Sequence, residues 1–163
     1  MIAAALVALS LFGERQSILE RGQTITRHHH VAGWTVRVMW DRFTGDISCT
    51  VSKGRVELQN DVLVFHAPAW VDTSDAVFRI DGGPARSVHE ATYEDQLRGY
   101  YREGGPLENP SAGAVALPSY YVTNAKWVYI RADAGRAPDG FDVRGFPQAL
   151  ALARTEKCPN LGP

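Results

Sequence analysis

Residues Trp34–Trp40 read Trp-Thr-Val-Arg-Val-Met-Trp and carry the clearest structural pattern of the chain. Apolar side chains recur at every second position, which is the period of a β-strand with one buried face. They are Trp34, Val36, Val38 and Trp40. Turn residues fill Asp41–Asp46, and Ile47–Val51 then repeats the alternation with Ile47, Cys49 and Val51 on one face. The sequence therefore predicts a β-hairpin early in a β-rich domain.

More short strands are predicted downstream, joined by turns and not by helices. They are Val56–Leu58, Val62–Ala67, Ala76–Ile80, Ala85–His89, Tyr120–Val122, Trp127–Arg131 and Phe141–Val143. Strands that follow one another through turns pair antiparallel. We therefore expect a mainly β protein, an antiparallel β-sandwich or a flattened barrel, that buries Trp34, Trp40 and Trp127.

The C-terminal segment changes to the period of a helix. Phe146, Ala149, Leu150 and Ala153 fall on one helical face. Pro147 suits a first helical turn, because the N–H that proline lacks would be unpaired there. The sequence predicts a C-terminal α-helix that ends near Cys158.

Two cysteines, Cys49 and Cys158, stand 109 positions apart. Met1–Phe12 is apolar except for one serine, which suggests export, and an even cysteine count in an exported domain suggests a disulfide. Such a bridge would tie the second strand of the hairpin to the terminal helix. A closed loop near 100 residues contributes at most about 4.7 kcal/mol.

The chain is expected to divide into three parts. Residues 1–12 form an apolar leader, a signal or a short anchor, too short to span a bilayer as a helix. A buried terminal helix is the alternative for this stretch. Residues 13–31 are expected to be a polar connector with a helical turn near Ser17–Arg21, and residues 32–160 a single β-rich domain. A periplasmic or secreted location follows.

The charge pattern bears on the kind of partner. Lys and Arg number 17 against 18 Asp and Glu, and no two Lys or Arg residues are adjacent. Binding through phosphates needs a clustered positive surface. The sequence therefore predicts no nucleic-acid partner.

Three segments together resemble the invasion-associated locus B family of bacterial exported proteins. They are Gly33–Arg37, Phe78–Gly83 with its Ile-Asp-Gly-Gly turn, and Asp142–Leu150, in which a Gly-Phe pair precedes an Ala-Leu helix. The chain departs from that family's pattern at Val38, where a cysteine is usual, and it lacks a second cysteine pair. The resemblance implies a small exported β-rich domain with a non-enzymatic role.

Residues 91–118 are the least regular part of the chain. Tyr93–Arg102 is expected to be a weak helix, and Gly104–Pro118 a loop. Five tyrosines gather around this segment: Tyr93, Tyr100, Tyr101, Tyr120 and Tyr121. Tyrosine brings large contact area and a hydrogen-bonding group, so they are candidates for a surface that binds an envelope or host protein. The alternative is that they pack internally.

Histidines offer two further hypotheses. His28 and His30 would share one face of an extended segment, and with His66 or His89 they could hold Zn²⁺ or Cu²⁺. His66 or His89 could instead be the base of a small envelope hydrolase, although no serine elbow, redox Cys pair or phosphate loop is present. The favoured function is a non-catalytic, cofactor-free envelope binding module that contacts its partner through residues 91–125.

Overall fold

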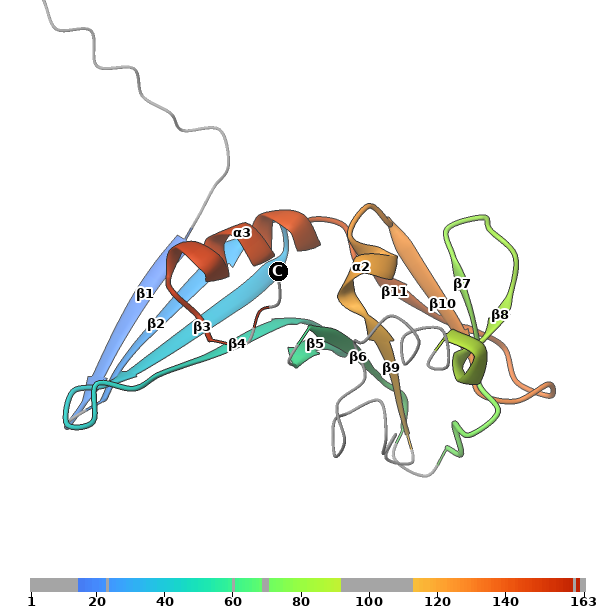
Figure 1. Cartoon of the computed structure of the whole chain (residues 1–163), viewed down its shortest axis with the longest axis horizontal. Coiled ribbons are helices and arrows are strands. Elements are labelled where there is room, and N and C mark those ends of the chain that lie inside the picture. The colour runs from blue at the N-terminus through green and yellow to red at the C-terminus, as the bar shows by residue number, and fades with distance from the viewer. Residues whose placement is uncertain are drawn as a thin grey trace, which may run out of the picture.

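In the computed structural model, residues 15–22, 24–59, 61–68, 71–91, 113–159 and 161 are described. Two antiparallel sheets and a C-terminal helix build a sandwich-like, mainly β protein with 47% strand and 15% helix (Figure 1). The expected β-sandwich with a terminal helix is confirmed. In the described part of the chain the sheets do not close into a barrel.

The larger sheet has seven strands in the order β1-β2-β3-β4-β5-β6-β9, and every neighbouring pair is antiparallel. Its strands are β1 (Arg15–Arg21), β2 (Thr24–Val31), β3 (Trp34–Asp41), β4 (Ile47–Lys53), β5 (Val56–Gln59), β6 (Val62–His66) and β9 (Ala114–Pro118). Successive strands are hairpin neighbours up to β6, as a meander requires.

The smaller sheet has four strands in the order β11-β10-β7-β8. Its strands are β7 (Val77–Ile80), β8 (Arg86–Ser87), β10 (Trp127–Arg131) and β11 (Asp139–Asp142). The predicted hairpin around Asp81–Pro84 is therefore present, but its second strand is only two residues long because residues 88–91 are already helical.

The helices α2 (Ser119–Val122) and α3 (Phe146–Thr155), with the helical turn at residues 88–91, complete the described fold. The helix α3 lies along β3 and β4, and the smaller sheet lies beside it over the other end of the large sheet (Figure 1). Two aromatic contacts mark these layers. Trp34 of β3 meets Phe146 of α3 at 5.3 Å between ring centroids, and Phe65 of β6 meets Phe141 of β11 at 5.2 Å.

One continuous core joins both layers. Trp34, Phe65, Phe78 and Phe146 are its largest fully buried side chains. The aliphatic members come from alternate positions of the strands, as the sequence pattern predicts, and include Val36, Val38, Val51, Leu58, Leu63, Leu117, Val128 and Ile130. Burial of apolar side chains on one face of each sheet is the main source of stability here.

Residues 15–31 correct the expectation of a connector for 13–31. They form β1 and β2, which extend the large sheet beyond β3. The sequence does not reveal these strands because most of their residues are polar, so no apolar alternation marks them. Ala32 and Gly33 close the β2–β3 hairpin with φ of 49° and 83°, the positive values that a tight two-residue turn requires.

Residues 114–122 correct two further expectations. Ala114–Pro118, predicted as loop, is strand β9, and its residues are all buried. Such a strand shows an apolar run and no alternation, because both of its faces are covered. Ser119–Val122, predicted as a strand that includes Tyr120 and Tyr121, is the short helix α2.

The expectation that Trp34, Trp40 and Trp127 are all buried is correct only for Trp34. Trp34 is fully buried, whereas Trp40 is 41% exposed and Trp127 is 36% exposed. Trp40 lies near the end of β3, and Trp127 lies on the outer face of the smaller sheet. The leader, the predicted helix Tyr93–Arg102 and most of the predicted loop lie outside the described residues.

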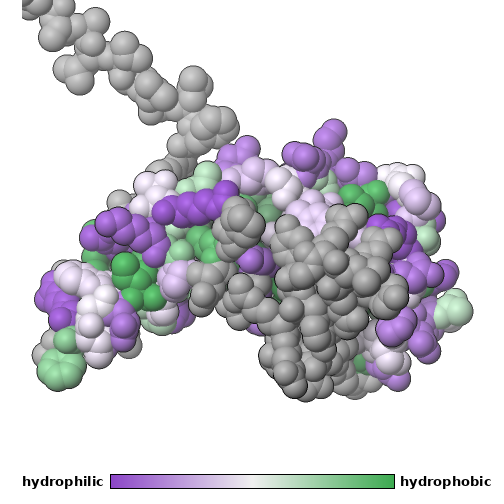
Figure 2. All heavy atoms as spheres, viewed as in Figure 1, coloured by the Kyte–Doolittle hydropathy of each residue, from purple (hydrophilic) through white to green (hydrophobic). Residues whose placement is uncertain are grey.

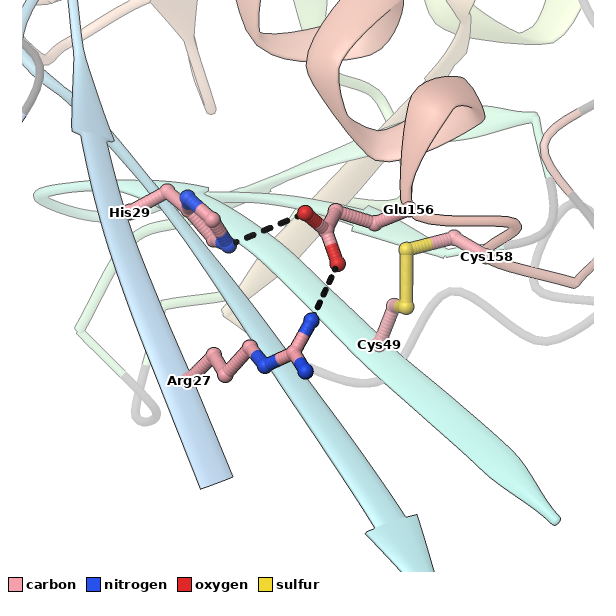
Figure 3. Close-up of a disulfide and its surroundings, with 5 residues drawn as sticks. All are labelled: Arg27, His29, Cys49, Glu156 and Cys158. Carbon is pink, nitrogen blue, oxygen red and sulfur yellow. Dashed lines mark hydrogen bonds and ion pairs between the residues drawn. A yellow bond between two sulfur atoms is a disulfide. The ribbon is translucent and has the colours of Figure 1, made fainter. Parts of the chain in front are cut away.

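The disulfide between Cys49 and Cys158 is confirmed (Figure 3). It joins β4 to the turn after α3, with 5.5 Å between the two Cα atoms. Beside it Glu156 reaches toward Arg27 at 3.5 Å and toward the buried ring of His29 at 3.4 Å. The C-terminal end of α3 is thus fixed to β2 and β4. None of the described helices is long and apolar enough to cross a membrane.

Candidate functional site

The outer face of the smaller sheet is the candidate site. Along β10 the side chains of Val128 and Ile130 point into the core, so Trp127, Tyr129 and Arg131 point outward. On the neighbouring strand β7, Arg79 stands directly opposite Tyr129. The pleat of the two strands therefore places two aromatic rings and two guanidinium groups together on one exposed face.

The aromatic pair has an ordered arrangement. The rings of Trp127 and Tyr129 are nearly parallel, 21° apart, with centroids separated by 6.2 Å. Both side chains are more than one third exposed. Gly140 of β11 leaves room for the Tyr129 ring, because a Cβ atom there would come within 3.3 Å of it. The guanidinium of Arg144 lies 5.5 Å from the Trp127 ring centroid.

A hollow of about 400 Å³ lies beside the aromatic pair. Its polar lining includes Arg79, Arg131, Arg136, Tyr129 and Asp81. The remaining lining residues are Val77, Phe78, Ala85 and Pro138. Three arginines against one carboxylate make the hollow electropositive, and its size falls in the range of small-ligand sites.

Asp81, the one carboxylate among the described residues of this lining, already accepts hydrogen bonds from the backbone. Asp81 Oδ1 accepts hydrogen bonds from the N–H groups of Lys126 at 3.0 Å and Trp127 at 2.8 Å. Asp81 has a φ of 48°, which the Asp-Gly-Gly turn accommodates. The Ile-Asp-Gly-Gly sequence therefore fixes the start of β10 and thereby the position of Trp127.

Arg79 and Arg131 are the cations that remain available to a ligand. Both are exposed, and within the described ranges neither forms an ion pair with a carboxylate. A guanidinium group is always protonated and presents a planar set of donors that matches a carboxylate, sulfate or phosphate. The face can thus bind an anionic group.

A second charged cluster borders the site, and in it Arg144 and Lys53 are paired with Asp142. Arg144 donates two hydrogen bonds to Asp142, Nε to Oδ1 at 2.8 Å and Nη2 to Oδ2 at 2.9 Å, and Lys53 Nζ lies 3.2 Å from Oδ2. The hydrogen bonds from Arg144 are the main reason that the pKa of Asp142 lies far below its ordinary value. This cluster holds the strand–helix junction and orients Arg144 over Trp127.

The predicted tyrosine surface is only partly described. Tyr93, Tyr100 and Tyr101 lie outside the described residues. Tyr120 and Tyr121 stack on one another in α2 at 4.7 Å between centroids. Tyr121 also packs edge-on against Phe78 of the core at 6.0 Å and beneath Arg86 at 5.2 Å. Tyr121 therefore contributes to internal packing.

The histidines are spread over the fold. His28 and His30 do share one face of β2, but in the described part of the chain no three His, Cys, Asp or Glu side chains are grouped as metal ligands. His30 Nδ1 lies 3.1 Å from Thr35 Oγ1. His66 lies on β6 and His89 on the helical turn 88–91, and no described hydrogen bond or ion pair joins either ring to a serine or carboxylate.

A further hollow of about 250 Å³ lies at the far end of the large sheet, next to the end of α3. Ile25, Val38, Trp40 and Ile47 form its apolar part. Figure 2 shows hydrophobic side chains among hydrophilic ones at this end of the molecule. The hollow follows from the length of β2–β4, which extend past the helix.

Sequence reasoning missed the outer face of the smaller sheet. The alternation Trp127-Val128-Tyr129-Ile130-Arg131 carries the pattern, since it leaves either the aromatic or the aliphatic set facing solvent. The prediction that Trp127 is buried concealed this exposed face.

Comparison of the chain with protein-family models, with curated proteins and with solved structures finds no match to any of them.

Proposed function

We propose that the protein is a non-catalytic binding module of the cell envelope, and that it recognises an anionic ligand on the outer face of the smaller sheet. One observation carries this proposal. The exposed Trp127–Tyr129 pair lies beside a hollow of about 400 Å³ lined by Arg79 and Arg131. Tryptophan, tyrosine and arginine are the residues that contribute most to binding surfaces.

The chemistry of the face favours binding over catalysis. A guanidinium group neither accepts a proton nor attacks an electrophile at ordinary pH, because it stays protonated. The phenol of Tyr129 and the indole of Trp127 offer flat area and hydrogen-bond donors at small entropic cost. These groups recognise a ligand without needing to change it. The hydrolase based on His66 or His89 and the metal site based on His28 and His30 stay predictions.

An exported location is part of the same proposal. The Cys49–Cys158 bridge is compatible with an oxidising compartment, where such bonds persist. The apolar leader at residues 1–12 points the same way. Membership in the invasion-associated locus B family stays a prediction, as does a contribution from the tyrosines of residues 91–125.

Chromatography on immobilised polyanions tests the proposal. The intact chain, the double variant R79Q/R131Q and the control R37Q/R42Q are applied to polygalacturonate, heparin and polyglutamate resins, with uncharged dextran as the blank. The control also removes two positive charges, from exposed positions on β3 and in the turn that follows it. We expect at least one polyanion to retain the intact chain and the control, and R79Q/R131Q to elute at lower salt. Equal elution of both variants, or no retention, would contradict the proposal.

A further inference from the structure

We infer that the ligand of this face is an acidic polysaccharide, whose carboxylates bind Arg79 and Arg131 while its sugar rings pack on Trp127 and Tyr129. This inference rests on the proposed function and specifies its ligand class. An acidic sugar chain presents a ring and a charge in each repeat. A surface that binds it must therefore offer both exposed aromatic rings and cations spaced to match the charges.

The placement of the two arginines fits a chain with repeated charges. Arg79 is opposite Tyr129, and Arg131 is two residues further along β10, opposite Val77. The two arginines are therefore diagonal neighbours across the strand pair, with backbones roughly 7–8 Å apart. Two forked guanidinium groups at this separation can hold two carboxylates of one extended ligand.

The aromatic pair supplies the surface for sugar rings. Trp127 and Tyr129 lie within 21° of parallel on one strand and are both exposed. The face of an aromatic ring is electronegative, so it attracts the C–H groups that cover one side of a pyranose ring. Tyr129 also lines the arginine hollow, so a sugar on the aromatic pair would continue into it.

The size of the face argues against a globular protein partner. Its strands are four, two, five and four residues long, and about half of those residues face outward. A stable protein–protein interface takes roughly 20–30 residues from each side. An extended chain needs far less area, because it places its binding groups along a line.

The charge distribution argues against a nucleic acid. The chain has a net charge of −1 and no two adjacent basic residues. Arg144 already pairs with Asp142, which leaves Arg79 and Arg131 as described cations of this face with no carboxylate partner. Binding through a phosphate backbone needs a broader basic surface. A carboxylated sugar needs only these two.

Calorimetric titration separates these ligand classes. The intact chain is titrated with hexagalacturonate, its fully methyl-esterified form, hexaglutamate and hexathymidylate at low salt. We expect hexagalacturonate to bind at least about tenfold more tightly than each of the others. Loss of charge in the ester removes the arginine contacts, and hexaglutamate lacks the sugar rings.

Variants locate the two halves of the site. R79Q/R131Q and Trp127→Leu are each expected to weaken hexagalacturonate binding at least about tenfold, whereas R37Q/R42Q leaves it unchanged. Circular dichroism confirms that each variant is folded. A different outcome is that hexaglutamate or hexathymidylate binds as tightly as hexagalacturonate or more tightly, with R79Q/R131Q still weakening that binding. This result would overturn the polysaccharide as the ligand class and leave the proposed function standing. Binding of no acidic oligomer would overturn both, and an unaffected Trp127→Leu would overturn sugar packing.

Discussion

Gly145 shows how a single residue sets the path of the chain into α3. Its φ is 84°, and a Cβ atom placed on it would lie 2.4 Å from the Cβ of Ala32 in the β2–β3 turn. The preceding carbonyl, that of Arg144, accepts hydrogen bonds from Trp34 Nε1 at 2.9 Å and Lys53 Nζ at 3.0 Å. The glycine of the Gly-Phe pair is therefore needed for the close approach between the β2–β3 turn and the start of α3.

We predict that Gly145→Ala destabilises the protein by about 2–4 kcal/mol, because left-handed strain adds to a steric overlap. Chemical denaturation measures the change. Gly54→Ala is the matched control, since Gly54 also has a positive φ, of 57°, but has nothing within 4 Å of its would-be Cβ. The control should cost about 1 kcal/mol or less. Equal losses at the two glycines would show that the contact with Ala32 does not matter.

Among the described residues, Asp142 has the side chain whose pKa the fold shifts most. Because its folded pKa lies below the ordinary value of 3.8, its carboxylate stabilises the folded state above that pH. This contribution is lost as the pH falls below about 3.8 toward the folded pKa.

Asp142→Asn should therefore lower the free energy of unfolding by about 1–2 kcal/mol near neutral pH, where Arg144 and Lys53 lose their anionic partner. The difference from the unaltered chain should shrink as the pH falls below 3.8. Urea unfolding between pH 2.5 and pH 7 measures it. A difference that stays constant with pH would mean that the carboxylate charge is not what stabilises the junction.

At the scale of elements, α3 depends on its connections to the large sheet. One face of α3 is buried against the rest of the protein, and Phe146, Ala149 and Ala153 on that face are fully covered. At its C-terminal end Glu156 contacts Arg27 and His29, and Cys158 is bonded to Cys49 (Figure 3). The bridge thus fastens the last described helix to a strand that lies 109 residues earlier.

Removal of the bridge by C49S/C158S is expected to lower the free energy of unfolding by about 2–4 kcal/mol, through the greater freedom of the unfolded chain. Denaturant titration gives that number. Amide exchange should show faster opening of α3 than of β3 in the variant, because the helix loses its terminal anchor. Uniform acceleration across the sheet would indicate that the bridge stabilises the whole domain and not the helix in particular.

The elements differ in how far the sequence predicts them. β3, β4 and α3 have clear apolar periods because each has one buried face, and these predictions are confirmed. β1 and β2 lack such a period, and they extend the sheet through backbone pairing, β2 with β3 and β1 with β2. β9 is buried on both faces, so its apolar run resembles neither an alternating strand nor a helix. Periodicity identifies only elements that have two different sides.

At the scale of the molecule, the candidate site arises from topology that no local pattern shows. Arg79 and Tyr129 are 50 positions apart and become neighbours because β10 inserts between β7 and β11. The sequence predicts both strands correctly, yet their pairing and the outward direction of Trp127 come only from the structure. The disulfide was accessible to sequence reasoning because two cysteines permit one pairing.

A nuclear magnetic resonance titration of the labelled chain with hexagalacturonate tests directly whether the outer face of the smaller sheet binds the ligand. The indole N–H of Trp127 and the guanidinium Nε–H groups of Arg79 and Arg131 should shift with a common dissociation constant, and the indole of Trp40 should not move. Trp127→Leu identifies the first resonance. Shifts confined to the Trp40 end of the large sheet, or no shift in any of these groups, would contradict the assignment of ligand binding to the outer face of the smaller sheet.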